Sequence, residues 1–186
     1  MASLDDILDW LGTDSRGVPY YLHPLNLVWS PQGAEDDLLR FQEVAARLQG
    51  DRGLWAGAIR CGAWRNTLAA CVCLLVAKER SFFHDLCGTF TAGTWVIPQV
   101  AVTIALLHPE EGRLFFEEFL ASPKAHGSAK RMVSAQRVLE RMGIFPESEI
   151  RLSGWPVLED DIALEANRIV LEQWEFWFPR LRSLHE

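Results

Sequence analysis

The pattern of hydrophobic and polar positions is dominated by one uncharged run from Leu86 to Pro109. Its middle, residues 94–107, leaves no polar face at helical spacing. A helix that is apolar all round has to be surrounded by other helices. We therefore expect this segment to be the central buried helix of the fold, with Thr94 as its N-cap and Pro109 just beyond its end. Its strictly apolar part is shorter than the about 20 residues of a membrane span, so no membrane contact is expected.

Amphipathic segments flank this run on both sides and predict further helices. Each carries apolar residues three and four positions apart, with polar residues between them. The expected ranges are 4–11, 34–49, 54–77 with a break near Cys61 and Gly62, 81–90, a segment beginning at Pro109, 128–142, and about 161–181. In the helix after Pro109, the expected inward residues are Leu114, Phe115, Phe119 and Leu120. In the last helix they are Ile162, Ala166, Ile169, Val170, Trp174 and Trp177.

Two segments lack this periodicity. Residues 18–33 hold three prolines and are expected to form an extended Pro-rich arm. Residues 144–160 are expected to form a loop before the C-terminal helix, in which Pro179 ends the regular part. The fold class that follows is all-α, with about seven or eight helices, and 186 residues are enough for one well-buried core. We therefore predict a single all-helical domain over residues 1–186.

Composition and charge narrow the range of functions. The chain is 49% hydrophobic and carries a net charge of −7, which argues against nucleic-acid binding because that draws mainly on Lys and Arg. Residues 1–50 and 144–186 each carry −5, whereas residues 51–107 carry +2 and residues 108–143 carry +1. These acidic ends are either solvated faces around the core or a surface that attracts a cationic partner.

The cysteines indicate a compartment. Cys61, Cys71, Cys73 and Cys87 lie in or beside apolar helical segments, which is typical of buried thiols in a reducing cytoplasm. The acidic N-terminus has no hydrophobic leader, so a cytoplasmic location is expected. Cys71 and Cys73 are not expected to share a metal, because residues two apart on a helix point in different directions.

Candidate catalytic chemistry is sparse. His84-Asp85 is the dipeptide of a class of metal-dependent, all-helical phosphohydrolases, but such a site needs further ligands. The only histidine upstream is His23, in the Pro-rich arm. No histidine follows a glutamate by three residues, and no nucleophile elbow or phosphate-binding glycine loop is present. We therefore predict no catalytic, cofactor or metal residues, and we lean toward a protein that is not an enzyme.

Other residues are candidates for contact with a partner or ligand. Lys130, Arg137 and Arg141 form a basic stripe on one helix face, which is either solvated or binds an acidic group if its charges are unpaired. Arg65, beside Trp64, is expected to bridge helices through a hydrogen bond. Near the C-terminus, Trp174 and Trp177 share one helix face, whereas Phe176 and Phe178 point elsewhere and are either packed or part of an interface.

The order of elements from Thr94 to Met142 is a buried helix, a tight His108-Pro109 turn, an amphipathic helix, a polar loop and another helix. This order resembles HEAT-like α-solenoid repeats, of the kind seen in uncharacterised bacterial and toxin-immunity proteins, over about a third of the chain. The resemblance implies a short solenoid or compact bundle that binds another protein, in its most concrete form a bacterial immunity-type protein that neutralises a cationic partner. The alternative is a small-ligand-binding or metal-dependent hydrolytic protein, with a pocket near Trp64, His84 and Trp95.

Overall fold

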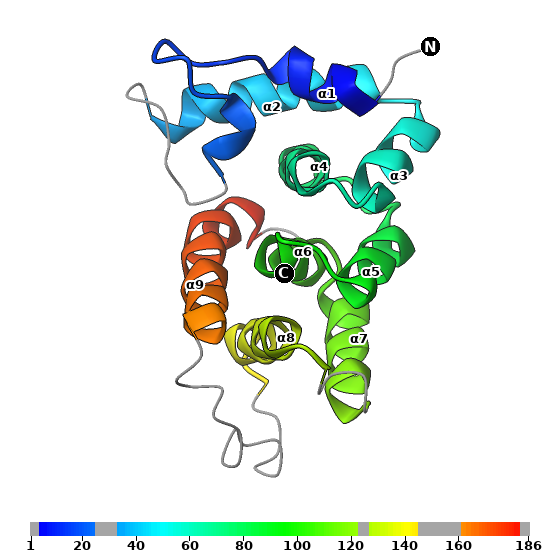
Figure 1. Cartoon of the computed structure of the whole chain (residues 1–186). Coiled ribbons are helices and arrows are strands. Elements are labelled where there is room, and N and C mark those ends of the chain that lie inside the picture. Colours follow the sequence, from blue (N-terminus) through cyan, green and yellow to red (C-terminus); the bar gives the residue numbers. More distant parts are fainter. Residues whose placement is uncertain (1–3, 25–32, 123–126, 145–160, 183–186) are drawn as a thin grey trace. The chain divides into compact units, whose positions relative to one another are not determined.

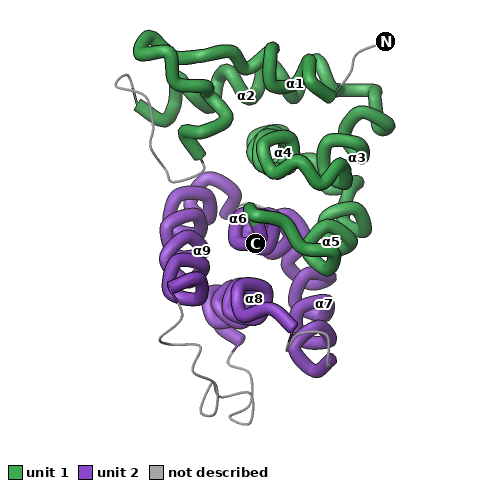
Figure 2. Tube along the Cα trace, viewed as in Figure 1, with its two compact units in different colours: residues 1–96 green, residues 97–186 purple. Residues whose placement is uncertain are grey.

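The fold is all-α in a computed structural model that describes residues 4–24, 33–122, 127–144 and 161–182. These residues form nine α-helices and one 3-10 helix, and their only β pairing is an isolated bridge between Thr13 and Pro19 (Figure 1). The predicted fold class is confirmed. The chain divides into two compact units, residues 1–96 and 97–186 (Figure 2). The single domain expected from the sequence stays a prediction.

Unit 1 is built around a buried helix that the sequence pattern did not single out. Its elements are α1 (Leu4–Leu11), a 3-10 helix (Tyr20–Leu22), α2 (Ala34–Leu48), α3 (Arg52–Arg60), α4 (Trp64–Ala77) and α5 (Phe83–Ala92). Helix α4 packs against α1, α2, α3 and the 3-10 helix. Every residue from Asn66 to Leu75 is buried. Helix α4 is therefore the core of unit 1.

Local sequence signals explain how the helices of unit 1 begin and end. Helix α1 has the predicted bounds. Helix α3 starts at Arg52, and the carboxylate of its N-cap residue Asp51 accepts a hydrogen bond from the Leu54 N–H at 2.9 Å. The predicted break near Cys61 and Gly62 is confirmed, because Gly62 adopts a left-handed φ of 74° between α3 and α4.

The Pro-rich arm differs from the expectation in its described part. Residues 20–22 form a 3-10 turn, and the backbone N–H of Tyr20 donates to the Gly12 carbonyl at 3.1 Å. The segment therefore folds back on itself and is not extended. Pro24 is the last described residue of this stretch. Pro31 falls within residues 25–32, which lie outside the described residues. Most of the predicted loop 144–160 lies outside them as well.

Unit 2 is built around the helix that the sequence predicted to be buried. Its helices are α6 (Ile97–Leu107), α7 (Pro109–Ala121), α8 (Ala129–Arg141) and α9 (Asp161–Leu181). All eleven residues of α6 are buried, and α6 packs against α7, α8 and α9. The helix begins at Ile97, so the predicted Thr94 N-cap is wrong. Because proline has no N–H and fits best at the start of a helix, a start next to Pro98 satisfies the backbone better.

No helix among the described residues is long and apolar enough to cross a membrane. The ends of α8 follow the sequence signals. The Ser128 hydroxyl accepts from the Arg131 N–H at 3.4 Å, and Gly143 closes the helix in a left-handed conformation. The N–H of Ile144 then donates to the Leu139 carbonyl at 2.9 Å, as a glycine-terminated helix requires.

Two inward faces of unit 2 were predicted only in part, with Phe119 and Leu120 of α7 among the residues that are confirmed as buried. On α7 the buried residues are Gly112, Phe116, Phe119 and Leu120, whereas Leu114 is 55% exposed and Phe115 is half-buried. The cause is close packing at Gly112, where an added Cβ would lie 3.2 Å from the Ile104 methyl group Cγ2.

On α9 the predicted inward face is confirmed except at its first residue. The buried residues include the predicted Ala166, Ile169, Val170, Trp174 and Trp177, whereas Ile162 is 57% exposed and its neighbour Ala163 is buried in its place. Helix α9 has the predicted bounds, Asp161–Leu181, but Pro179 lies inside it, so the expectation that its regular part ends at Pro179 is wrong.

Three of the four cysteines, Cys71, Cys73 and Cys87, are buried in unit 1, and all four are free thiols. Burial raises the pKa of the Cys87 thiol to about 12. At neutral pH this side chain is therefore a protonated, apolar group, as the sequence predicted for the buried cysteines.

Candidate functional site

A surface cavity of about 390 Å³ lies in unit 1 beside the predicted candidate His84. Its walls come from the turn between α3 and α4 and from the outer side and C-terminal end of α5. The lining residues are Arg60, Gly62, His84, Asp85, Gly88, Thr89, Ala92, Gly93 and Thr94. On α5, Gly88 contributes no side chain to the cavity lining, and a Cβ there would meet no atom within 4 Å.

The charges around this cavity partly neutralise each other. The Arg60 guanidinium lies 3.1 Å from an Asp85 carboxylate oxygen. The His84 ring is exposed and packs against Phe83, with 5.5 Å between ring centroids. The Thr89 hydroxyl donates to the Ile59 carbonyl at 3.0 Å. His84-Asp85 is thus a solvent-facing helical pair, and no group of three metal-ligating side chains occurs among the residues described.

Trp95 lies directly after the cavity residue Thr94, in the turn that precedes α6. Its side chain is 81% exposed, the highest exposure among the large hydrophobic residues described. Gly93, with φ of 94°, ends α5 and redirects the chain just before it. Trp95 therefore follows the cavity wall in the chain but is not one of its lining residues. Of the predicted group of Trp64, His84 and Trp95, only His84 lines this cavity.

Trp64 and Arg65 lie at the start of α4, where each has a local contact. The half-buried Trp64 ring meets Tyr21 edge-on, with 6.3 Å between centroids. The Arg65 guanidinium lies over the Trp64 ring at 4.7 Å. Arg65 is exposed, so the predicted role of a buried charge that bridges helices is wrong.

The basic residues of the stripe on α8 have acidic groups close to them. Arg137 pairs with Glu140 on the same helix, and Arg141 lies 3.0 Å from Glu175 of α9. Lys130 is half-buried. Burial lowers its pKa, and the nearby Glu165 carboxylate opposes that shift. Because an anion would have to compete with these carboxylates, the stripe is better explained as a paired helix face than as a binding site.

The aromatic residues of α9 are mostly packed. Trp174 and Trp177 are buried, as predicted for their shared face. Phe178 stacks on Trp174 with centroids 5.4 Å apart, and the Arg180 guanidinium covers the Phe176 ring at 3.9 Å. Both phenylalanines are half-buried, which favours the packing alternative for Phe176 and Phe178 over an open aromatic patch.

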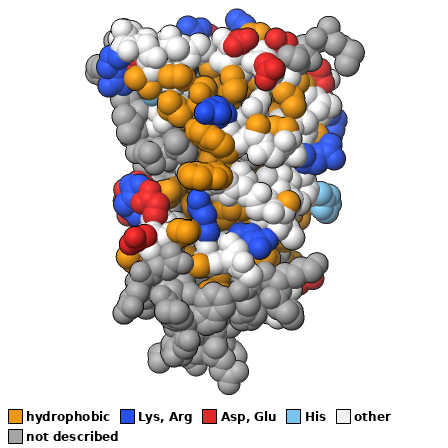
Figure 3. Space-filling view, viewed as in Figure 1, with side chains coloured by type: hydrophobic (Ala, Val, Ile, Leu, Met, Phe, Trp, Pro, Cys, Tyr) orange, Lys and Arg blue, Asp and Glu red, His pale blue; other side chains and the backbone are white. Residues whose placement is uncertain are grey.

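A further surface was missed in the sequence, on the outer face of α2. Leu39 is 57% exposed there. Glu35, Asp36 and Glu43 are exposed too and lie three or four positions from it, so they are its neighbours on the helix surface. Figure 3 shows hydrophobic side chains reaching the surface among charged ones in the part of the view that holds unit 1. The sequence does indicate this surface, because Leu39 is an apolar residue on the polar side of the helical pattern.

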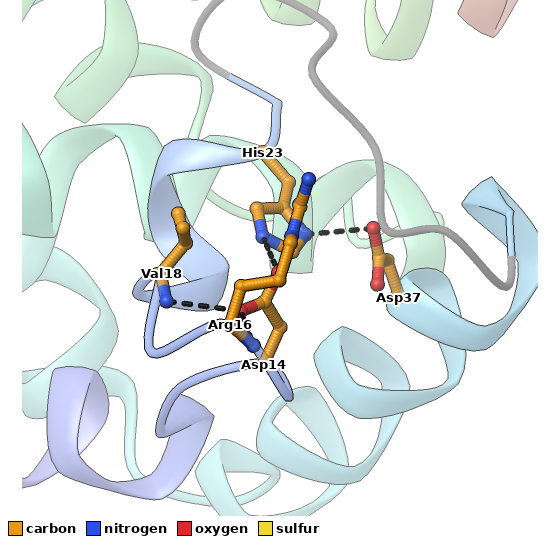
Figure 4. A network of polar contacts seen from close by, with 5 residues as sticks. All are labelled: Asp14, Arg16, Val18, His23 and Asp37. Carbon is orange, nitrogen blue, oxygen red and sulfur yellow. Dashed lines mark hydrogen bonds and ion pairs between the residues drawn. The ribbon is translucent and has the colours of Figure 1, made fainter.

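The strongest polar cluster of unit 1 was also missed, and it is buried (Figure 4). His23 and Asp37 are fully buried, and Asp14 is 7% exposed. The His23 Nδ1 atom lies 2.8 Å from Asp37 Oδ2, and its Nε2 atom lies 3.3 Å from Asp14 Oδ2. Arg16 completes the cluster, with its Nε atom donating to Asp14 Oδ2 at 2.9 Å.

The Asp14 carboxylate is strongly held by its own turn. Its Oδ1 atom accepts hydrogen bonds from the backbone N–H groups of Arg16 and Val18, at 2.8 and 2.9 Å. Burial raises its pKa, but the hydrogen bonds from Val18 and Arg16 outweigh it and lower the pKa of Asp14 to about 2. The Asp-Ser-Arg-Gly sequence is a recognisable turn signal. The contact with Asp37 joins residues far apart in the chain, so periodicity could not reveal it.

Comparison of the chain with protein-family models, with curated proteins and with solved structures gave no significant match to any of them. Any function is therefore inferred from the arrangement of the chain's own residues. Three features of unit 1 stand out: the cavity beside His84, the outer face of α2, and the buried cluster around His23.

Proposed function

We propose that the protein is a non-enzymatic binding module that recognises another protein through the exposed Trp95. A tryptophan that is 81% exposed leaves a large apolar surface in water, and its burial by a partner is favourable at roughly 25 cal/mol per Å². Tryptophan is also among the residues that most often dominate the binding energy of protein interfaces. The exposure of Trp95 is the observation that carries the proposal.

We propose further that the partner is cationic. Leu39 on α2 offers a second apolar contact, and Glu35, Asp36 and Glu43 surround it. Arg40 pairs with Glu43 at 2.8 Å, so the net negative charge around Leu39 comes from Glu35 and Asp36. An acidic surface with an apolar centre favours a partner with complementary charge. A bacterial immunity-type protein that neutralises a cationic toxin is the most concrete form of this proposal.

A second candidate function is the binding of a small ligand in the cavity of about 390 Å³ beside His84. This volume is at the lower end of the range for ligand pockets. The Arg60–Asp85 pair on its wall could orient a polar group. A ligand or metal that stays bound through purification, and is lost in an H84A variant, would favour this candidate over protein binding.

The proposal is tested by affinity capture with the wild-type chain and two single variants. Trp95→Ala removes the exposed ring from unit 1. As a matched control, Leu114→Ala removes an exposed apolar side chain from unit 2. We expect a basic protein to be captured by the wild type and by L114A. Its affinity for W95A should be lower by about tenfold or more, the scale of an interface hot spot.

The cationic character of the partner is tested separately. Asp36→Asn with Glu43→Gln removes two carboxylates beside Leu39 without changing their size. We expect slower association and a weaker dependence on salt concentration, because charges at the edge of an interface mainly steer encounter. Equal binding of W95A and wild type would contradict the proposed interface. A captured partner with an acidic surface would contradict only the second proposal.

A further inference from the structure

We propose that a second cavity of unit 1 binds a free α-amino acid with an apolar side chain, with the ligand carboxylate at Arg52 and the ligand ammonium group at Glu79. The cavity has a volume of about 290 Å³ and lies between the C-terminal ends of α2 and α4 and the start of α3. The inference is separate from the proposed partner surfaces, because neither Trp95 nor Leu39 with its acidic neighbours lines this cavity.

Two helix ends shape the walls of this cavity. Gly50, with a left-handed φ of 95°, turns the chain from α2 into α3. At the other wall, Lys78 ends α4 with a φ of 52° and is the one non-glycine residue with a positive φ in the described part of the chain. The backbone N–H of Glu79 then donates to the Leu74 carbonyl at 3.0 Å. Glu79 is therefore held in the wall by a hydrogen-bonded turn and not by an open loop.

The space itself arises from small side chains beside two large ones. Trp55 and Phe82 are buried and lie against each other, with 5.6 Å between ring centroids, and they form an apolar wall. Next to them the lining consists of residues with little or no side chain, namely Ala45, Ala46, Gly50 and Ala77. A volume of about 290 Å³ is just below the usual range of ligand pockets, about 300–1,000 Å³, so the ligand has to be small.

Arg52 supplies the cation of the lining, and two contacts fix its position. Its Nη2 atom donates to the Ser81 carbonyl at 3.3 Å, and its guanidinium lies 5.2 Å from the centre of the Phe82 ring. A guanidinium has several N–H donors in a rigid fork, so this single hydrogen bond leaves donors for another group. The fork matches the two oxygens of a carboxylate, which makes a carboxylate the ligand group that fits Arg52 best.

Glu79 supplies the anion of the lining. Its Oε1 atom accepts from the Ser81 backbone N–H at 2.7 Å. A hydrogen bond from the Ser81 side chain lowers the pKa of Glu79 most, burial opposes this shift, and the Ser81 N–H and the positive charge of Arg52 lower the pKa further. The carboxylate is therefore ionised at neutral pH. A carboxylate has more acceptor sites than these hydrogen bonds use, so it can also accept from an ammonium group.

The charges of the lining select the class of ligand. Arg52 and Glu79 are its charged residues, so the lining is neutral overall. In the described part of the chain the Arg52 guanidinium hydrogen-bonds to the Ser81 carbonyl and not to Glu79, so a ligand does not have to break an ion pair first. A ligand with one charge would meet one attractive and one repulsive group, whereas a zwitterion is complementary to both. An apolar α-amino acid adds a side chain that the wall of Trp55 and Phe82 can cover.

The experiment measures binding of L-leucine and L-phenylalanine to the full chain by isothermal titration calorimetry, with NMR to locate the site. We expect saturable binding of at least one of the two, with shifts of the Trp55 indole N–H and of the backbone amides of residues 50–52 and 79–82.

Two analogues of the tighter-binding amino acid then test the charges, namely the acid without the ammonium group and the amine without the carboxylate. For leucine these are isocaproate and isopentylamine, and for phenylalanine they are hydrocinnamate and phenethylamine. Each analogue should bind about tenfold or more weakly than the amino acid, because each loses one charge-assisted contact.

Single variants test the two charged residues. Arg52→Gln and Glu79→Gln should each lower the affinity for the amino acid by about tenfold or more. R52Q should not weaken binding of the amine, and E79Q should not weaken binding of the acid, since each of those ligands lacks the group that the removed charge binds. Arg60→Gln is the matched control. It removes an exposed arginine at the other end of α3, which lines the cavity beside His84, and it should bind the amino acid as the wild type does.

Absence of saturable binding of both amino acids would overturn the proposal, and so would analogues that bind as tightly as the amino acid. Loss of binding in R60Q but not in R52Q would place the ligand in the cavity beside His84 and would overturn it as well. The amino-acid and analogue measurements use the wild-type chain, so they stand even if a variant does not fold. None of these outcomes affects the test of Trp95, which follows a captured protein.

Discussion

Helices α6 and α7 of unit 2 lie close together at Gly112, so a substitution there has an effect whose size follows from the structure. Gly112 of α7 faces α6, where an added Cβ would lie 3.2 Å from Ile104 Cγ2 and 3.3 Å from the Ile104 carbonyl oxygen. Ile104 and Ala105 are fully buried in α6, so neither has free space to move into. Gly88 of α5 is the matched control, because a Cβ there would meet nothing within 4 Å.

The change Gly→Ala has the same intrinsic effect at both positions, since alanine is favoured over glycine inside a helix by about 0.5–1 kcal/mol. We therefore expect G88A to stabilise unit 1 by about that amount. At Gly112 the added methyl group also overpacks the contact with α6, at a cost of about 1–3 kcal/mol. The free energy of unfolding of G112A should therefore be lower than that of G88A by about 1–3 kcal/mol.

The measurement is urea denaturation of both variants and the wild type, with native-state hydrogen exchange to assign each change to unit 1 or unit 2. The comparison between the two variants cancels helix propensity and leaves the steric contribution. If G112A and G88A stabilise the protein equally, the close packing of α7 on α6 is wrong. The inward face inferred for α7 then has to be reconsidered.

Three further predictions concern stability. Phe116→Ala removes a fully buried ring from α7 and should lower the free energy of unfolding by about 3–5 kcal/mol in urea denaturation, whereas a change below about 1 kcal/mol would show that Phe116 is not in the core. Asp51→Ala removes the cap of α3 and should cost about 1 kcal/mol, seen as a lower thermal midpoint that Asp51→Asn largely restores. The pKa of Asp14 is lowered from 3.8 to about 2, so its contribution to the free energy of unfolding is present above about pH 4 and is lost as pH falls toward about 2. Acid unfolding of Asp14→Asn, followed by circular dichroism, should therefore depend less steeply on pH than that of the wild type. An unchanged profile would contradict the hydrogen bonds assigned to Asp14.

Candidate functional residues were predicted with less success than the helices. His84 does line a cavity, and Trp95 follows the lining residue Thr94 in the chain. Arg65 was expected to be a buried charge but is exposed. Lys130, Arg137 and Arg141 have acidic groups close by, partly from α9. Such pairing between helices depends on their packing, which a local pattern does not contain.

The sequence by itself determined the helices and the burial of α6. These features depend on signals that act within a few residues, so they follow directly from the sequence. The signals are the all-apolar sequence of Ile97–Leu107, the cap at Ser128 and the glycine at position 143. Tertiary structure decided the division into two units, the second buried helix α4, the exposure of Leu114 on α7 and of Ile162 on α9, and the meeting of His23 with Asp14 and Asp37. Each of these depends on close approach between segments distant in sequence, and hydrophobic spacing does not specify which of two similar faces comes closest.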